Sequence, residues 1–370
     1  MSSSEKEVFR VHVLGADHGD CTLIEYGRDS KIHCVVIDGG TVATFPRLLN
    51  ILNQLDAAEM DLLVVTHVDN DHIGGVLPLV EHHFSRRFKD VWFNGRHHLN
   101  SEGNLEPFGA VKGERLTAAL LKGTPWNYAF DNEAVRLDDH GYPRQYTLAG
   151  GAKVTVLSPG KSELSAMIPR WDYEVKKAGM LPAQRTVIPS PPPGFESMGP
   201  SSINIKALAS KESDLDKSEP NGSSIALLVE FGNRKALFAG DAFPNVLIES
   251  ALKLPKEELV DGKVHLDLFK LPHHGSQGNV TTELLEKFPS KQYVFSTNSK
   301  IHKHPDDVAV ARVIEYGQQL EHAPLLVFNY ATSKTSPWGT LSRNANVMKN
   351  YKFSTEFGED DKGIVIDLMQ

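Results

Sequence analysis

The feature that most constrains this chain is a cluster of metal-ligand side chains directly after a short apolar run. Residues 62–65 are typical of a buried strand, and residues 76–80 have the apolar spacing of a helix. Between them, six positions hold His67, Asp69, Asp71 and His72. One aspartate could cap the helix, but a cap requires neither the second aspartate nor the histidines. The cluster therefore predicts a metal site on a loop at the carboxyl end of a strand, where α/β sheets usually hold their sites.

Three other strand-like runs end in side chains of the same kind. Asp38 follows the run 32–37, Asp241 follows the run 235–239, and the pair His273 and His274 follows the run 266–271. A carboxylate before paired glycines is also a common turn, so Asp38 alone decides nothing. Because four strand ends carry carboxylates or imidazoles, we expect these distant side chains to converge around metal ions.

Composition and net charge indicate what kind of protein this is and which binding partners suit it. The 370 residues are 40% hydrophobic and 23% charged, which is ordinary for a globular chain with a large core. A formal net charge of -8 argues against a broad binding surface for long duplex nucleic acid, but not against a small anionic substrate met by metal ions. The sequence leaves the oligomeric state open.

The N-terminal residues, the length of the apolar runs and the cysteines indicate the cellular compartment. The polar N-terminus has no apolar segment of the signal-peptide kind, and no apolar run approaches the ~20 residues of a membrane span. The two cysteines, Cys21 and Cys34, both lie in apolar runs. We therefore expect buried free thiols, a cytoplasmic location and no membrane partner.

One stretch departs from the regular pattern. Within residues 162–220, the part 189–200 is rich in Pro, Ser and Gly, and the part 210–220 is charged and polar. We expect a single domain over residues 1–370 that carries a variable, poorly packed insertion at 162–220, with one helix near 170–179. The insertion would be a lid over the site, an interaction arm or, by default, a plain surface loop.

In order and spacing, these motifs resemble the metallo-β-lactamase superfamily. The second motif of that family is usually His-x-His-x-Asp-His, and here Asp69 stands in place of the second histidine. With Gly19-Asp20 and the runs 37–40, 238–241 and 270–276, this variant resembles the hydrolase domain of ComEC-type DNA-uptake proteins and their stand-alone soluble relatives. The resemblance covers residues 8–160 and 221–315. It implies an α/β fold, a four-layer αββα sandwich, with a dinuclear metal site at one edge, but no DNA-uptake role, since no channel segment is present.

The resemblance also implies a ligand set. His67 and Asp69 would bind one metal ion, Asp71 and His72 the other, and Asp241 would bridge both. His273 or His274 would supply the last imidazole, and the sequence does not say which.

Other roles follow from the same resemblance. The third family motif falls near Asn221 to Ser224, a region that includes Ser223 and holds no histidine, so one side of the site would be poor in ligands or completed by water. Asp38, and with less support Asp20, would orient a ligand from behind. His304 would donate a proton or contact phosphate.

The expected chemistry follows from charge. Two divalent ions about 4 Å apart can share a hydroxide, lower the pKa of water from ~16 to ~7 and clamp the attacking and leaving oxygens. A carboxylate at Asp69 shifts the preference towards Mn²⁺, with Zn²⁺ as the alternative. We therefore predict a dinuclear phosphodiesterase or nuclease in which Asp71 is essential. A carboxylic ester or lactone hydrolase of the same fold, and a catalytically silent metal-binding sensor, stay open as alternatives.

Overall fold

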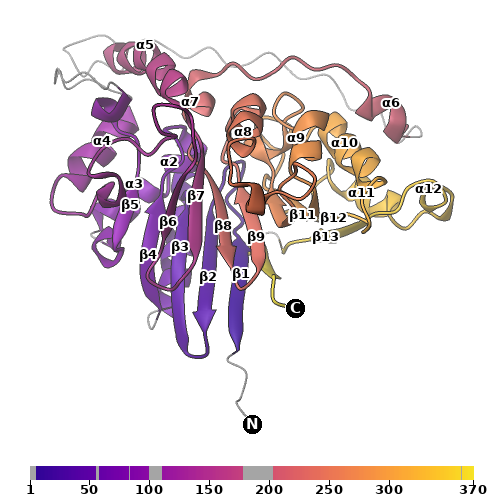
Figure 1. The fold of residues 1–370 in the computed structure, drawn as a ribbon, viewed down its shortest axis with the longest axis horizontal. Helices are drawn as coiled ribbons and strands as arrows, with labels where there is room; N and C mark the ends of the chain where they lie inside the picture. Colours follow the sequence, from indigo (N-terminus) through magenta and orange to yellow (C-terminus); the bar gives the residue numbers. More distant parts are fainter. Residues whose placement is uncertain (1–5, 56–57, 83, 100–110, 178–202, 360) are drawn as a thin grey trace.

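Two β-sheets form the centre of the molecule (Figure 1). The computed structural model describes residues 6–55, 58–82, 84–99, 111–177, 203–359 and 361–370. Within these ranges the first sheet contains, in spatial order, β14 (Ile364–Asp367), β1 (Glu7–Val13), β2 (Thr22–Arg28), β3 (Lys31–Ile37), β4 (Glu59–Val64) and β5 (Asp90–Trp92). The second contains β13 (Ser354–Phe357), β12 (Leu325–Phe328), β11 (Ser290–Phe295), β10 (Leu266–Lys270), β9 (Arg234–Phe238), β8 (Ala226–Phe231), β7 (Lys153–Ser158) and β6 (Arg144–Thr147).

The apolar pattern of the strands explains why both faces of each sheet are covered. In β4, Leu62 and Val64 face the core between the sheets, whereas Leu63 packs under helices. In β9, Phe238 faces the core between the sheets and Leu237 faces outward. Because successive side chains of a strand point to opposite faces, strands that are apolar at consecutive positions need a partner layer on each side.

Helices provide the outer layers, as Figure 1 shows for α3 and α4 on one side and α8 to α10 on the other. The set packed against the first sheet comprises α1 (Phe45–Gln54), α2 (Asn70–Ile73), α3 (Val76–Glu81), α4 (Val111–Leu120) and α5 (Lys161–Lys177). The set packed against the second comprises α6 (Ile205–Ala209), α8 (Pro244–Ala251), α9 (Thr282–Lys287), α10 (Asp307–Gly317), α11 (Ser336–Leu341) and α12 (Ala345–Met348). The predicted αββα sandwich is therefore confirmed.

Shorter elements complete the chain. They are α7 (Glu219–Gly222) and the 3₁₀ segments η1 (Val42–Thr44), η2 (Phe84–Arg87), η3 (Arg96–Leu99), η4 (Tyr128–Phe130), η5 (Lys256–Glu258) and η6 (Pro272–Gly275). In the part of the chain that the structure describes, no helix combines the length and apolarity that a bilayer crossing requires.

The stretch predicted as an insertion is better packed at its start than expected. Helix α5 begins at Lys161 and continues through Pro169, whereas the sequence predicted a helix only near 170–179. Leu164 and Trp171 are buried with the residues of α3 and α4. The expectation of poor packing is therefore wrong for the part of the predicted insertion that α5 covers. Residues 178–202 of the predicted insertion lie outside the described residues.

Parallel pairing brings the ligand-bearing strand ends to the same end of the sandwich. Ile37 of β3 pairs with Val64 of β4, and Phe238 of β9 pairs with Lys270 of β10, with each pair of strands parallel. The residues that follow these positions are the ones that carry the predicted ligands. The fold therefore delivers side chains from both sheets to one edge, as expected for sites at the carboxyl ends of parallel strands.

Replacing Trp171 by Ala tests whether α5 is part of the core. The indole is 1% exposed, and a Cβ added to Gly113 of α4 would lie 2.6 Å from its ring, so the two helices are in close contact. We expect the free energy of unfolding to fall by about 3–5 kcal/mol, the usual cost of emptying a large aromatic site. Tyr173→Ala, at a side chain 57% exposed on the same helix, should cost less than about 1 kcal/mol. Equal losses in denaturant titrations of the two variants would contradict the packing.

Candidate metal centre

Asp38 holds the loop that follows β4. One of its carboxylate oxygens accepts a hydrogen bond from the backbone N–H of Thr66 at 2.8 Å. The other accepts from the Thr66 hydroxyl at 2.7 Å and lies 2.8 Å from Nδ1 of His72. Asp38 has a φ of 60°, in the left-handed region that Asp enters more readily than most residues. This buried carboxylate therefore fixes the direction of the His72 ring from behind.

Two further imidazoles are anchored in the same manner, through Nδ1. Nδ1 of His67 lies 3.0 Å from the Thr66 hydroxyl and 3.1 Å from that of Ser224. Nδ1 of His274 donates to the backbone carbonyl of Ser296 at 2.9 Å. When Nδ1 carries the proton, the lone pair is on Nε2, which is the form of the ring that binds a metal ion.

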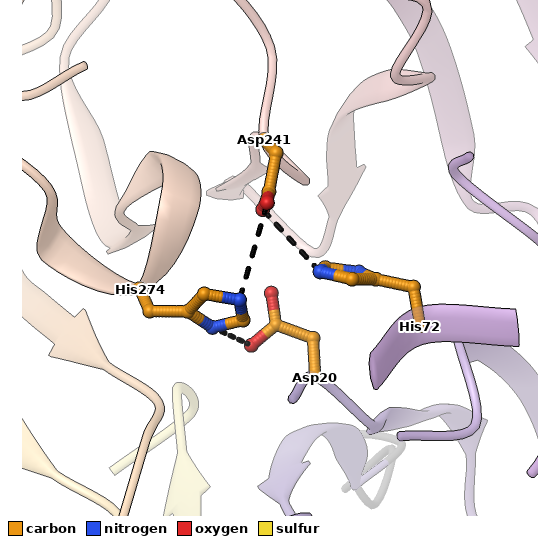
Figure 2. Close-up of side chains that lie close together, drawn as sticks. All are labelled: Asp20, His72, Asp241 and His274. Atoms are coloured by element: carbon orange, nitrogen blue, oxygen red, sulfur yellow. Dashed lines mark ion pairs between the residues drawn. The ribbon is translucent and has the colours of Figure 1, made fainter. Parts of the chain in front are cut away.

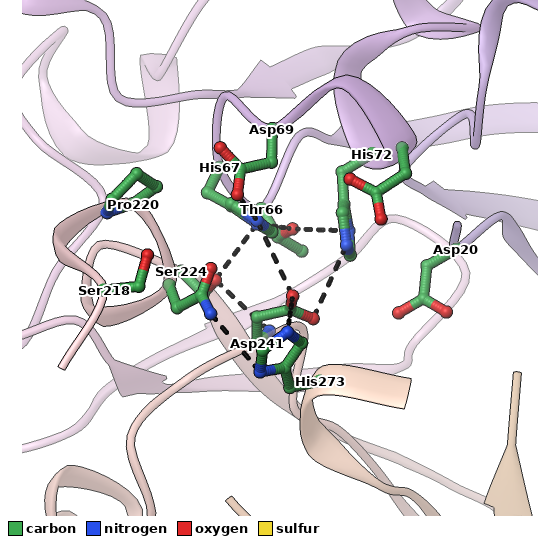
Figure 3. Close-up of polar contacts among 12 residues, drawn as sticks. Asp20, Thr66, His67, Asp69, His72, Ser218, Pro220, Ser224, Asp241 and His273 are labelled. Atoms are coloured by element: carbon green, nitrogen blue, oxygen red, sulfur yellow. Dashed lines mark hydrogen bonds and ion pairs between the residues drawn. The ribbon is translucent and has the colours of Figure 1, made fainter. Parts of the chain in front are cut away.

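Asp241, directly after β9, is the carboxylate on which the imidazoles converge (Figure 3). Its Oδ2 lies 3.8 Å from Nε2 of His67 and 3.9 Å from Nε2 of both His273 and His274. Its Oδ1 lies 3.5 Å from Nε2 of His72. Most of these separations exceed hydrogen-bond length, so the nitrogens surround the carboxylate without closing on it.

A tighter group of four lies within this set (Figure 2). Asp20, His72, Asp241 and His274 each offer one ligand atom, and these atoms lie within 4.8 Å of one another. Asp20 comes from the loop between β1 and β2, and its other oxygen pairs with the buried Lys270. The sequence assigned Asp20 a supporting role, and its Oδ1 lies 3.3 Å from Nδ1 of His274, on the far side of that ring from Asp241, which is compatible with that role (Figure 2).

Unsatisfied buried atoms show that these residues fit a metal ion. In the described part of the chain, Nε2 of the three imidazoles His67, His72 and His274 and Oδ1 of Asp241 are buried without a hydrogen-bond partner. Leaving a buried polar atom unpaired costs about 1–3 kcal/mol, so four at one place require an explanation. Imidazole nitrogens and carboxylate oxygens are the donors that Zn²⁺ and Mn²⁺ accept, and a divalent ion would satisfy these atoms.

Pairing between opposite charges outweighs burial in setting the pKa values of the site residues. Burial would lower the pKa of His274, but Asp20 and Asp241 raise it to about 10. The pKa of His72 is likewise raised, because Asp241 and Asp38 outweigh its burial. Burial would raise the pKa of Asp241, but the neighbouring imidazoles, His72 first, hold it well below its usual range. Imidazolium–carboxylate pairs thus balance the metal-free site, and an incoming cation would displace protons.

Of the remaining predicted residues, Asp71 lies beside the ligand nitrogen of His274, whereas Asp69 is more exposed and His304 packs beside His273. The Asp71 carboxylate is 3.4 Å from Nε2 of His274, and burial, which would raise its pKa, is outweighed by His274 and His72, which lower it. The Asp69 side chain is 43% exposed, with one oxygen 3.7 Å from Nε2 of His67. The ring of His304 has its centroid 5.1 Å from that of His273, and its Nδ1 lies 3.5 Å from Asp306.

The region of the third motif, residues 221–224, contributes hydrogen-bonding side chains and no imidazole. Ser223 donates its hydroxyl to the Pro220 carbonyl at 2.7 Å, and its neighbour Ser224 occupies the place beside His67. Asn221 donates to the carboxylate of Asp216 at 2.7 Å. Ser224 lies within the region that the sequence marked, but sequence reasoning missed Asp216, since an aspartate in a polar stretch carries no distinctive pattern. Lys270, by contrast, has a distinctive pattern, because it is a charged residue in a largely apolar strand.

Comparison with known proteins agrees with the geometry in the first part of the chain. Residues 14–91 match the sequence model of the metallo-beta-lactamase superfamily. No curated protein matches this chain in sequence.

Solved structures offer distant likenesses. The metallo-beta-lactamase fold protein YhfI from Bacillus subtilis is 11% identical, with 98% of this chain and 100% of that chain covered and a TM-score of 0.41. A variant of the beta-hydroxylase CmlA is 12% identical, with 99% of this chain and 55% of that chain covered and a TM-score of 0.41. A protein of unknown function from Enterococcus faecalis is 10% identical, with 96% and 77% covered and a TM-score of 0.25. None of these similarities assigns an activity to this chain.

Asp38→Asn tests the support behind His72. The variant keeps the shape of the side chain but removes the negative charge beside Nδ1, and we expect Mn²⁺ or Zn²⁺ affinity to fall about 10–100-fold. Asp29→Asn in the exposed turn between β2 and β3 is the matched control, because Asp29 also has a left-handed φ, of 53°. Titration calorimetry against each metal measures both. Unchanged affinity in Asp38→Asn would show that the carboxylate does not orient a ligand.

Proposed function

We propose that this chain is a metal-dependent hydrolase, a phosphodiesterase that acts on nucleic acid or on a small nucleotide-like anion. The observation that carries the proposal is the set of buried, unpartnered imidazole and carboxylate atoms around Asp241. The superfamily match over residues 14–91 supports hydrolysis in general. The resemblance of the motif set to ComEC-type hydrolase domains favours a phosphodiester.

The proposed cofactor is a pair of divalent ions, Mn²⁺ or Zn²⁺. His67 and Asp69 would hold one, and Asp71, His72 and His274 the other, with Asp241 between them. Bound ions of this kind supply a nucleophile at neutral pH by acidifying water, and they stabilise charge on the substrate's oxygens. The chain's own contribution is to keep the three imidazoles in the Nδ1-protonated form through Asp38, the Ser296 carbonyl and the hydroxyls of Thr66 and Ser224.

A cation beside the site suits an anionic substrate. Burial and Arg115 lower the pKa of Lys112 on α4, and the nearby Asp71 partly offsets them. Among the described residues, no carboxylate forms an ion pair with Lys112, so its ammonium group remains available to a phosphate. The net charge of -8 fits a small or single-stranded substrate better than long duplex DNA.

His304 is the proposed carrier of the leaving group's proton. Burial lowers the pKa of His304, with Asp306 only partly opposing it, so the ring is neutral at pH 7 before substrate arrives. An anionic substrate would favour the protonated ring and make it an acid. In this role Asp306, whose carboxylate lies 3.5 Å from Nδ1, would orient the ring.

We also propose a reducing, cytoplasmic setting. Both cysteines, Cys21 and Cys34, are free and buried. Burial raises the pKa of the Cys34 thiol to about 12 and that of Cys21 further, so neither is a reactive thiolate at neutral pH.

The activity itself is testable with purified protein. Loaded with Mn²⁺, the chain should hydrolyse bis(p-nitrophenyl) phosphate or single-stranded DNA, and chelation should remove the activity. Asp71→Ala should lower kcat at least about 10³-fold, since it deletes a charged group from the ligand set. Asp139→Ala, at an exposed loop position, should retain activity.

The outcomes separate the alternatives. Full activity in Asp71→Ala would reject the assignment of the site. Turnover of lactones or carboxylic esters without any phosphodiester would favour the esterase alternative. Less than about one metal ion per chain after purification without chelator would favour the silent sensor, because two ions are required for this chemistry.

The leaving group tests His304 separately. A general acid contributes about 10²–10⁴-fold when the leaving group is a poor one. His304→Ala should therefore slow cleavage of an alkyl or nucleoside phosphodiester by about 10²-fold, yet hardly affect a p-nitrophenyl ester, whose phenolate leaves without a proton. Equal slowing of both substrates would assign His304 to substrate binding.

A further inference from the structure

We infer that His273 is a metal ligand in its own right and replaces the histidine that the third motif lacks. The neighbouring residues His273 and His274 would then serve different ions, His273 the ion held by His67 and Asp69. This inference rests on the dinuclear site proposed above, and it assigns both adjacent histidines to that site, where the sequence required only one of them.

The His273 ring has the same arrangement as the other inner imidazoles. Its Nδ1 lies 3.1 Å from Oδ1 of Asn279 and 3.3 Å from Oδ2 of Asp216, both acceptors. The amide nitrogen of Asn221 is farther away, at 3.4 Å, and donates to Asp216 at 2.7 Å. The proton is therefore on Nδ1, and the lone pair on Nε2 faces Asp241. Its Nε2 lies 3.9 Å from Oδ2 of Asp241, and Nε2 of His67 lies 3.8 Å from the same oxygen (Figure 3).

The third-motif region supplies no ligand of its own, but its side chains help to hold the His273 ring in place. Asn221 donates to Asp216 at 2.7 Å, and Asn279 donates to the same oxygen at 3.0 Å. The backbone N–H of Ser218 donates to the other oxygen at 2.9 Å. Asp216 is therefore held in place by three donors and in turn orients His273, in the way that buried carboxylates orient ligand histidines.

The backbone of η6 explains how adjacent residues can serve separate ions. His273 and His274 have φ values of 48° and 55°, both in the left-handed region. Their ring centroids lie 5.9 Å apart with planes inclined at 65°. Nε2 of His274 lies 3.4 Å from the Asp71 carboxylate, whereas Nδ1 of His273 lies 3.4 Å from the side-chain amide of Asn221. Two consecutive left-handed non-glycine residues are uncommon and are typical of functional sites.

His273→Gly is the decisive variant, because glycine favours the left-handed φ that the position requires. Reconstituted with Mn²⁺ and freed of loose metal, the wild-type chain should hold about two ions and the variant about one. Elemental analysis gives the count. The spectrum of a spin-coupled Mn²⁺ pair should become that of an isolated ion, and added imidazole should restore the second ion. His302→Ala, which removes a nearby exposed imidazole, should keep both.

Each outcome decides between the inference and the function beneath it. A wild-type chain with two ions and a folded His273→Gly variant with two would overturn the inference and leave the proposed function intact. A wild-type chain that never holds more than one ion would overturn the dinuclear function, and the inference with it.

Asp216→Asn approaches the same question without removing the ligand. The variant should weaken the affinity for one ion about 10–100-fold and leave the other unchanged. Asp214→Asn, at an exposed position two residues away, is the matched control. Unchanged affinity for both ions in Asp216→Asn, together with two ions in His273→Gly, would leave His273 as a packing residue.

Discussion

The site depends on one buried carboxylate, Asp241, that faces four imidazole nitrogens at distances longer than most hydrogen bonds. Four Nε2 atoms approach Asp241 within 3.5–3.9 Å, and none of them completes the arrangement by hydrogen bonding alone. Burying a carboxylate among neutral rings is costly, and neighbouring cations offset part of that cost. The charge required at this position can come from protons on the histidines or from metal ions, and the geometry of the surrounding loops is consistent with both.

Much of this arrangement could be predicted from the sequence, because its elements are local. An apolar run followed by His67 and Asp71 identifies a strand end whatever the rest of the fold, and the same holds for Asp241. The layered sandwich followed from the resemblance of these motifs to a known superfamily, and the consecutive apolar positions of strands such as β4 and β9 agree with sheets covered on both faces. Each strand end contributes carboxylate or imidazole side chains, and these residue types can be read directly from the sequence.

The remainder depends on tertiary contacts that local patterns do not contain. Helix α5 runs through Pro169 because packing of Trp171 against α4 outweighs the helix-breaking tendency of proline. Strands β6 and β13 are short edge strands with alternating exposure, so no apolar run marked them. Which of the two adjacent imidazoles faces Asp71 is set by backbone angles in η6, and residue identity alone could not decide it.

The convergence of strand ends from both sheets at one edge has a consequence for the integrity of the chain. The first sheet contributes Asp20, Asp38 and His72 to the shared edge, and the second contributes Asp241 and His274. Neither half of the polypeptide therefore contains a complete coordination sphere. A cation held there cross-links the sheets non-covalently, so nicked or truncated chains would lose it together with the heat resistance that a native-state ligand confers.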